Sequence, residues 1–137
     1  MYSFMEHQPF NLDQLKTAHA KVKSGADFPV YIREISKLGV KSYSTYVSDG
    51  HTVFKGDNVF ELSSDAKYAQ QTISDNANPD AFQEQLKTHQ QGGSDYLTFI
   101  TQCAAAGVEN WVVNIAEMTC TYYDKAGHKM LTETIPG

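Results

Sequence analysis

The chain lacks the features that mark membrane, secreted and nucleic-acid-binding proteins. Its 137 residues contain no apolar run long enough to cross a bilayer, and the first ten residues lack the basic and apolar segments of a signal peptide. Lysine residues are scattered singly, whereas phosphate binding needs clustered positive charge, and the net charge is -5. We therefore expect a cytoplasmic protein whose partners are neither nucleic acid nor membrane.

Cysteine and metal-binding patterns are also scarce. Cys103 and Cys120 are the only cysteines, too few for a disulfide scaffold, and a reducing compartment favours free thiols. None of the five histidines has a second histidine or a cysteine at zinc-binding spacing, so we expect no metal and no other cofactor. Gly92-Gly93 lacks the lysine and hydroxyl residue of a phosphate-binding loop and is followed by Asp95. The absence of a catalytic motif favours a protein without enzymatic activity and leaves an enzyme as the alternative.

The feature that is present is a helix and strand pattern that occurs twice. The segment from Asp27 to Phe54 reads as a helix, a glycine, an alternating strand, a turn and a second strand. Gly39 and Gly107, 68 positions apart, end the two helices. The same offset pairs Gly25 with Gly93, Asp27 with Asp95, Phe28 with Tyr96, Tyr31 with Phe99, Ile32 with Ile100, Val40 with Val108, Tyr43 with Trp111, Val47 with Ile115 and Phe54 with Tyr122. Any two helix–glycine–strand units share some of these helix-end residues, but the matched apolar positions favour an internal duplication.

Length and composition fit one α+β domain that contains this repeat. A chain of 137 residues with 41% hydrophobic residues can bury a sizeable core. We expect residues 1–10 to be a flexible tail and residues 11–137 to be a single domain, with half-repeats over about 12–62 and 80–133. Each half has two helices and three antiparallel strands, and the helices cover one side of the sheet. The expected helices are 11–23, 27–38, 78–89 and 95–106, with a short helical turn at 65–69, and the expected strands are 40–48, 51–55, 59–62, 108–116, 118–123 and 128–134.

The first hairpin is expected to have a two-residue turn at Asp49-Gly50. An Asp-Gly pair favours a type I′ turn, because this turn needs positive φ at both central residues. Ser48 would then face His51 across the hairpin. The alternation of side chains places Tyr43 on the core face of the sheet and Tyr46 on the opposite face.

Three segments resemble a known family when they are taken together. They are Ala18 to Pro29 (AHAKVKSGADFP), Tyr46 to Val53 (YVSDGHTV) and Met118 to Gly127 (MTCTYYDKAG). The family consists of small bacterial and prophage proteins that are classed as a domain of unknown function, and some members are labelled "phage envelope protein". The resemblance runs from about Leu12 to Pro136. It implies a one-domain protein of bacterial or prophage origin and supplies no catalytic residue.

The candidate binding residues lie on the face of the sheet opposite the core. Tyr46 and His51 belong to the first hairpin, Tyr123 and His128 belong to the last hairpin, and Asp49 lies in a turn. Tyrosine offers an apolar ring with a polar tip and histidine changes charge near neutral pH, so both suit recognition. The partner would be a small molecule or a protein, including a second copy of the chain. The alternative is an ordinary solvated sheet face, on which hydroxyl side chains are common.

Two functional classes remain open from the sequence. An enzyme built from Tyr46, Asp49, His51 and Tyr123 would show a concave pocket in which titratable groups converge with perturbed pKa values. A binding protein would show an open patch instead, on this sheet face or in a groove between the two halves. The two cysteines favour neither class, because both occupy expected core positions.

Overall fold

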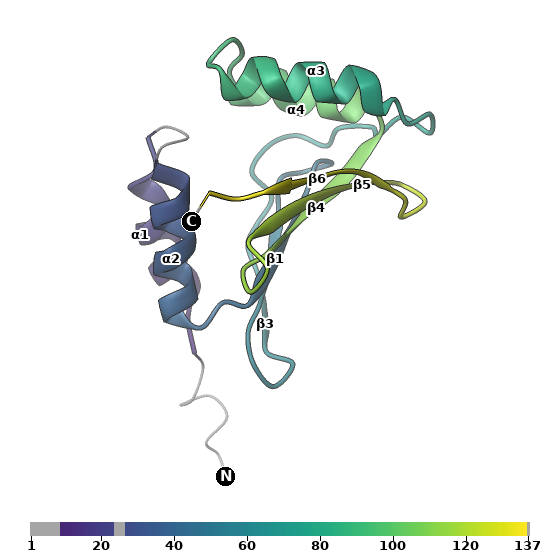
Figure 1. Cartoon of the computed structure of the whole chain (residues 1–137). Helices are drawn as coiled ribbons and strands as arrows, with labels where there is room; N and C mark the ends of the chain where they lie inside the picture. Colours follow the sequence, from purple (N-terminus) through teal and green to yellow (C-terminus); the bar gives the residue numbers. More distant parts are fainter. Residues whose placement is uncertain (1–8, 24–26, 137) are drawn as a thin grey trace.

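The order of the elements repeats once along the chain, as helix, helix and three strands. The computed structural model describes residues 9–23 and 27–136. The first half consists of α1 (Leu12–Ala20), α2 (Phe28–Leu38), β1 (Ser42–Tyr46), β2 (Thr52–Lys55) and β3 (Glu61–Ser63). The second half consists of α3 (Pro79–Gln90), α4 (Tyr96–Ala105), β4 (Val108–Asn114), β5 (Thr119–Asp124) and β6 (Lys129–Thr134). Figure 1 shows the two helix pairs beside one curved sheet, and the predicted α+β class is confirmed.

Local capping residues set the ends of the helices. The side chain of Asn11 accepts the backbone N–H of Gln14, and the side chain of Gln14 accepts the backbone N–H of Asn11, both at 2.9 Å. These reciprocal bonds satisfy two N–H groups that a helix start leaves free. Gly39 ends α2 with φ 113° and Gly107 follows α4 with φ 86°, the left-handed conformation that glycine adopts without strain.

Asp27 does not cap α2, contrary to the prediction. Its counterpart Asp95 does cap α4, because its carboxylate accepts the backbone N–H of Thr98 at 2.7 Å. Asp27 has a helical backbone conformation, and its carboxylate accepts the backbone N–H of Lys23 at 2.9 Å instead. The two halves therefore begin this helix at equivalent positions, but only the second half caps it with the aspartate side chain.

The six strands form one antiparallel sheet in the order β3-β2-β1-β4-β5-β6. β1 and β4 meet in the centre, and each half continues outward in the same strand order. At this junction Ser44 pairs with Val112, which is the residue 68 positions later in the chain. A residue that pairs with its own repeat counterpart lies on a twofold pseudo-axis, so the predicted repeat is also a symmetry of the sheet.

The register of the strands repeats with the same offset near the turns, and bulges in the second half interrupt it elsewhere. Corresponding pairs are Tyr43–Phe54 with Trp111–Tyr122, and Lys55–Glu61 with Tyr123–Lys129. Equal offsets in both hairpins mean that the connecting loops have equal lengths. The two halves are therefore similar both in the residues that end their helices and in the pairing of individual strand residues.

The predicted two-residue turn at Asp49-Gly50 is wrong. The backbone N–H of Tyr46 donates to the carbonyl of His51 at 3.0 Å, so Tyr46 and not Ser48 faces His51. The loop consists of residues 47–50, and the N–H of Gly50 donates to the carbonyl of Tyr46 at 2.8 Å. The Asp49 carboxylate accepts the backbone N–H of His51 at 3.0 Å, which stabilises this longer turn. The register differs from the predicted one by an even number of residues, so each side chain keeps its predicted face.

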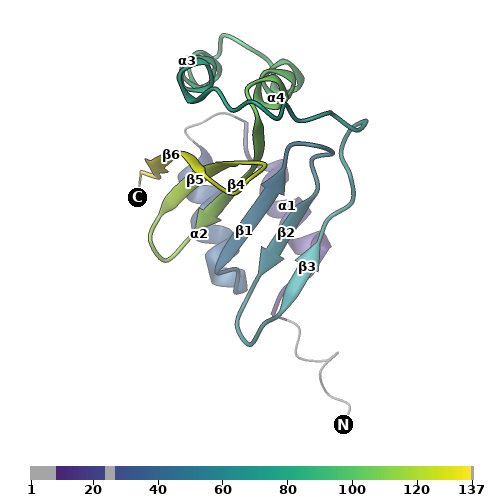
Figure 2. The same cartoon turned by 90° about the vertical axis from the view of Figure 1, so that its right-hand side faces the viewer.

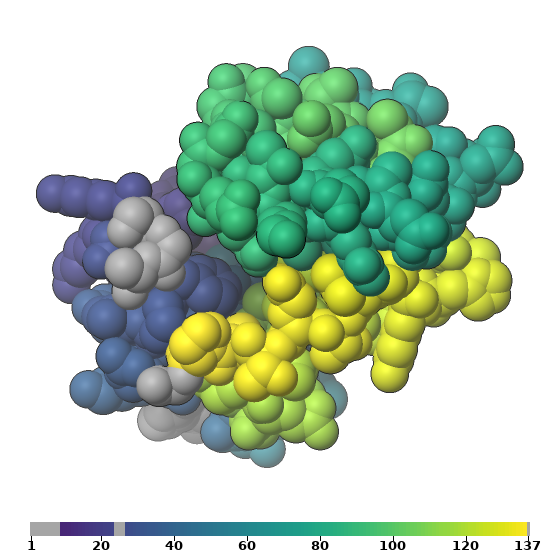
Figure 3. All heavy atoms as spheres, turned by 45° about the horizontal axis from the view of Figure 1, so that its top comes forward, coloured from purple at the N-terminus to yellow at the C-terminus, as the bar shows by residue number. Residues whose placement is uncertain are grey.

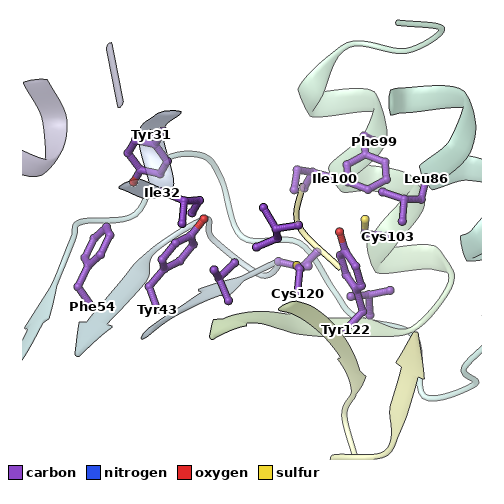
Figure 4. Packing of buried hydrophobic residues seen from close by; sticks show 14 of the residues in the cluster. Tyr31, Ile32, Tyr43, Phe54, Leu86, Phe99, Ile100, Cys103, Cys120 and Tyr122 are labelled. Carbon is purple, nitrogen blue, oxygen red and sulfur yellow. The ribbon is translucent and has the colours of Figure 1, made fainter. Parts of the chain in front are cut away.

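Both helix pairs cover the same face of the sheet, and the core lies between them and the strands. Figure 4 shows side chains of α2 above Tyr43 and Phe54, and side chains of α4 above Cys120 and Tyr122. The opposite face of the sheet, which we call the outer face, is turned toward the viewer in Figure 2, with α1 and α2 behind it. The predicted placement of all four helices on one side is confirmed.

The predicted flexible tail is wrong at Phe10, because this residue belongs to the core. Phe10 is 1% exposed, and its ring meets the ring of Phe60 edge-on at a centroid distance of 5.0 Å. Gly56 leaves room for it, since a Cβ there would come within 3.0 Å of the Phe10 ring. Residues 1–8 and the matched Gly25 lie outside the described residues.

The connection between β3 and α3 is irregular, and the helical turn predicted at 65–69 does not form. Long-range bonds hold this segment to the first hairpin. The backbone N–H of Lys67 donates to the carbonyl of Asp49 at 2.7 Å, and the hydroxyl of Tyr68 donates to the carbonyl of Val47 at 2.8 Å. The strands are shorter than predicted at most ends, and β3 covers 61–63 rather than 59–62.

Val59 lies at the tip of the β2–β3 hairpin in a conformation that suits glycine. Asn58 and Val59 have φ values of 58° and 57°, and Val59 is 97% exposed. A left-handed conformation costs an ordinary residue about 1–2 kcal/mol, and a β-branched side chain is poorly tolerated there. The repeat places Gly127, with φ 85°, at the corresponding position of the β5–β6 hairpin. Because Val59 is almost fully exposed, no packing contact compensates its strain.

We expect Val59→Gly to raise the free energy of unfolding by about 0.5–1 kcal/mol, because the relieved strain exceeds the added freedom of the unfolded chain. Urea unfolding followed by circular dichroism measures the change. Val59→Ala is the matched control and should gain less, since it keeps the Cβ atom. Equal or lower stability of the glycine variant would contradict the left-handed conformation.

Candidate functional site

Five side chains form one cross-strand row at one end of the outer face. Tyr46 pairs with Asn110, Asn110 pairs with Tyr123, and Tyr123 pairs with Lys129, while His51 faces Tyr46 on β1. We call these five residues the outer row. Neighbouring strands lie about 4.8 Å apart, so the row extends over about 19 Å from the first to the last strand position.

The first hairpin holds His51 in a defined orientation. Asp49 Oδ1 lies 2.5 Å from His51 Nδ1, and the rings of Tyr46 and His51 are stacked with centroids 4.6 Å apart and planes at 4°. The backbone hydrogen bond from His51, followed by the side-chain bond, holds the pKa of the Asp49 carboxyl below its usual value. The ionised carboxylate engages Nδ1, so Nε2 is the ring nitrogen that is not bonded to Asp49.

Asn110 lies between two tyrosines of the outer row. It pairs with Tyr46 on β1 and with Tyr123 on β5, so these tyrosines stand two strand spacings apart, about 10 Å. Because one face of the Tyr46 ring is stacked on His51, its other face is turned toward the strand that carries Asn110. We call the three cross-strand positions Tyr46, Asn110 and Tyr123 the tyrosine slot.

Two irregularities of the sheet adjoin Tyr123. The register shifts between Val108 and Asn110 on β4, and it shifts again between Tyr122 and Tyr123 on β5. Such bulges redirect side chains and are common beside binding sites. The pairing of β5 is therefore irregular next to Tyr123 with both of its neighbours, β4 and β6.

A second Asp–His pair lies in the β5–β6 turn. Asp124 Oδ2 is 3.2 Å from His128 Nδ1, and Asp124 Oδ1 accepts the backbone N–H of His128 at 2.9 Å. The backbone bond from His128 lowers the pKa of the Asp124 carboxyl. His128 is 79% exposed at the margin of the outer row, and Figure 1 shows this turn projecting away from α1 and α2.

The predicted binding residues thus come together at one end of the outer face. Tyr46, His51 and Tyr123 belong to the outer row, Asp49 orients His51, and His128 adjoins the row. Asn110 and Lys129 were not among the predicted binding residues. The place of Lys129 depends on the bulge before Tyr123, for which the sequence gives no signal.

The internal repeat supplies a comparison for the outer row. The pseudo-axis relates it to a row at the other end of the same face, in which Thr119 corresponds to His51, Asn114 to Tyr46, Ser42 to Asn110, Lys55 to Tyr123 and Glu61 to Lys129. The equivalent positions of the other row therefore carry small and charged side chains. The aromatic rings are a feature of the outer row and not of the repeated strand pattern.

The surface is hollowed away from the outer row. A shallow depression of about 510 Å³ lies between α1 and α2, where Lys21 and Glu34 form an ion pair at 3.4 Å. Figure 3 shows a further hollow between the first helix pair and the second. His19 and His89 contact the rings of Tyr31 and Phe99 within their own helix pairs, which identifies them as packing residues.

Within residues 9–23 and 27–136, no three histidine, cysteine, aspartate or glutamate side chains lie close enough together to hold a metal ion. In the same part of the chain, none of the helices has the length and apolar character needed to cross a membrane.

Both cysteines are buried and free, as predicted. Burial raises the pKa of Cys103 to about 12, and it raises the pKa of Cys120 to about 12 as well. Because the thiolate is the reactive form, neither group suits nucleophilic catalysis near neutral pH. The expectation that both occupy core positions is confirmed.

We expect the two thiols to react with the disulfide reagent DTNB at pH 8 at least about 100-fold more slowly in the native protein than in guanidinium chloride, because thiolate is rare in the folded state. The absorbance of the released thiolate measures both rates. Rapid reaction of either cysteine in the native protein would show that its burial is incomplete.

Comparison with known proteins places the chain in a family without assigning it an activity. A search of the curated proteins found no match. Residues 16–134 match the profile of a family described as "Protein of unknown function (DUF1398)", and this description does not include the label "phage envelope protein". The match covers most of the 137 residues. The chain therefore belongs to this family of unknown function.

Proposed function

We propose that the protein is a binding protein that holds a small neutral molecule in the tyrosine slot. The observation that carries this proposal is the slot itself, in which Tyr46 and Tyr123 stand on either side of Asn110. The corresponding row at the other end of the outer face contains no aromatic residue, which favours a role of the rings in recognition. Aromatic rings with polar tips supply apolar contact area and hydrogen bonds at the same position.

Charge supports a neutral ligand over an anionic one. The net charge of the chain is -5, and the low pKa values keep Asp49 and Asp124 ionised beside the outer row. These two carboxylates repel a phosphate or carboxylate group that approaches the slot. Lys129 is the one cationic side chain in the row, and it lies at its far end.

An enzyme is the second candidate, because the Asp49–His51 pair has the arrangement in which a carboxylate orients an imidazole base. The pair lies on an open sheet face with the His51 side chain 31% exposed, whereas such chemistry relies on a site that excludes water. Among the described residues, no serine, threonine or cysteine side chain is hydrogen-bonded to His51. A binding site therefore fits this geometry better than an active site.

Nuclear magnetic resonance with isotope-labelled protein tests the proposal. A library of small neutral fragments should produce chemical-shift changes that cluster at Tyr46, His51, Asn110 and Tyr123. Tyr46→Ala should abolish these changes, whereas Asn114→Ala, at the symmetry-related position, should leave them unchanged. Shifts confined to the α1–α2 depression, or to the hollow between the helix pairs, would contradict the proposal. Chemical conversion of a bound fragment that disappears in His51→Ala would favour the enzyme instead.

A further inference from the structure

We infer that the ligand of the tyrosine slot is a carbohydrate, with one pyranose ring held between Tyr46 and Tyr123. This inference rests on the proposed function and names the class of its ligand. Three independent properties of the outer row support it: the strand spacing between the two tyrosines, the kinds of polar group in the row, and the short side chains next to it.

The backbone spacing of the two tyrosines favours a thick saturated ring over a flat aromatic one. Tyr46 and Tyr123 stand two strand spacings apart, about 10 Å. A flat ring held face to face by two aromatic rings needs about 7 Å, from carbon contacts of about 3.5 Å on each side. A pyranose ring is thicker, because C–H bonds project from both of its faces, and these bonds contact aromatic faces favourably.

The polar groups of the row match hydroxyl groups, each of which both donates and accepts a hydrogen bond. The Asn110 amide and the tyrosine hydroxyls can do the same, so each can bond a sugar hydroxyl in either direction. With its Nδ1 engaged by Asp49, a neutral His51 presents Nε2 as an acceptor. Lys129 adds donors at the other end of the row.

The row is long and open enough for more than one sugar ring. The positions beside it on the same face carry mostly small side chains, namely Ser44, Val53, Val112 and Thr121. These side chains form a low floor next to the taller aromatic residues. Further rings of an oligosaccharide can therefore lie on the sheet without displacing any large side chain.

Titration of the labelled protein with neutral disaccharides tests the inference. We would add cellobiose, maltose, lactose and N,N′-diacetylchitobiose separately, each to about 20 mM, a range that detects weak binding. Adenosine monophosphate and glucose 6-phosphate serve as flat and anionic comparisons. At least one disaccharide should shift the signals of the Asn110 side-chain amide and of Tyr46.

Variants locate the binding site. Tyr46→Ala and Tyr123→Ala should each raise the Kd of that disaccharide at least about tenfold, because each removes one aromatic wall of the slot. Asn114→Ala, the symmetry-related control for Tyr46, should leave the Kd unchanged. The dispersion of the amide spectrum confirms that each variant is folded, and a more conservative variant, Tyr46→Leu, replaces any that is not.

The outcomes separate this inference from the proposed function. If neutral fragments bind the outer row but none of the four disaccharides does, the carbohydrate inference fails and the binding function stands. Tighter binding of adenosine monophosphate at the slot than of every disaccharide would also overturn the inference. If a disaccharide binds and Tyr46→Ala leaves its Kd unchanged, the slot is not the site and both proposals fail.

Discussion

Replacement of Gly107 by alanine is expected to lower the free energy of unfolding by about 3 kcal/mol or more, from a left-handed conformation and a steric clash together. Gly107 has φ 86°, which strains any residue with a side chain. A Cβ atom there would come within 2.8 Å of Ala77 Cα and 3.1 Å of the carbonyl oxygen of Asn76. Both neighbours are backbone atoms, so no side-chain rotation relieves the contact.

The segment that meets Gly107 is also fixed by hydrogen bonds. The backbone N–H of Asn78 donates to the carbonyl of Ala106 at 2.8 Å, and the N–H of Ser74 donates to the carbonyl of Ala104 at 2.9 Å. These bonds tie the segment before α3 to the end of α4, so it cannot move away without losing them.

Gly92→Ala is the matched control for Gly107→Ala. Gly92 has φ 83°, close to that of Gly107, but no atom lies within 4 Å of its added Cβ. Its replacement should therefore lower the free energy of unfolding by only about 1 kcal/mol, from the backbone conformation alone. Chemical denaturation of both variants isolates the steric clash as their difference. Equal losses would mean that residues 76–77 do not pack against Gly107.

The repeat could be predicted from the sequence because its signals are local. Gly39 and Gly107 end helices through their own backbone conformation, and alternation along the strands assigns Tyr43 and Trp111 to the core face. Strand parity is insensitive to an even shift of register, so the faces were predicted correctly although the first hairpin was not. Pairing of Ser44 with Val112 then follows from symmetry and not from any local pattern.

The errors arose where distant contacts decide the conformation. Asp49-Gly50 has the composition of a two-residue turn, but the carboxylate of Asp49 instead bonds both the backbone and the ring of His51. Phe10 is buried by its contact with Phe60, about fifty positions away in the chain, which no local pattern reveals. The segment at 65–69 stays irregular because its backbone bonds residues of the first hairpin.

The candidate site was predictable only in part, for the same reason. The alternation of side chains along each strand places Tyr46, His51 and Tyr123 on one face, and this alternation is a local property. Their alignment in a single row depends on the central pairing of β1 with β4, and this pairing also introduces Asn110. The tyrosine slot is therefore a product of the pseudo-symmetric sheet, and neither half forms it alone.

Trp111 carries the second large expected effect, because it is the only tryptophan and lies on the core face near the centre of the sheet. It pairs with Thr45 on β1 and with Tyr122 on β5, and its ring lies 5.9 Å from the ring of Tyr122. The residue is partly buried against the core cluster. Truncation removes apolar contacts that link the two halves and leaves a gap that the surrounding rings cannot fill.

We expect Trp111→Ala to lower the free energy of unfolding by about 3 kcal/mol, at the lower end of the range for large aromatic residues because the ring is not fully covered. Urea unfolding of the variant and the parent protein measures the loss. Val112→Ala, at the next residue and on the outer face, is the matched control and should lower it by about 1 kcal/mol or less. A loss below about 1 kcal/mol for Trp111→Ala, with a larger loss for Val112→Ala, would mean that the strand presents its other face to the core. That outcome would also remove Asn110 from the outer face, so this single comparison tests the fold and the tyrosine slot together.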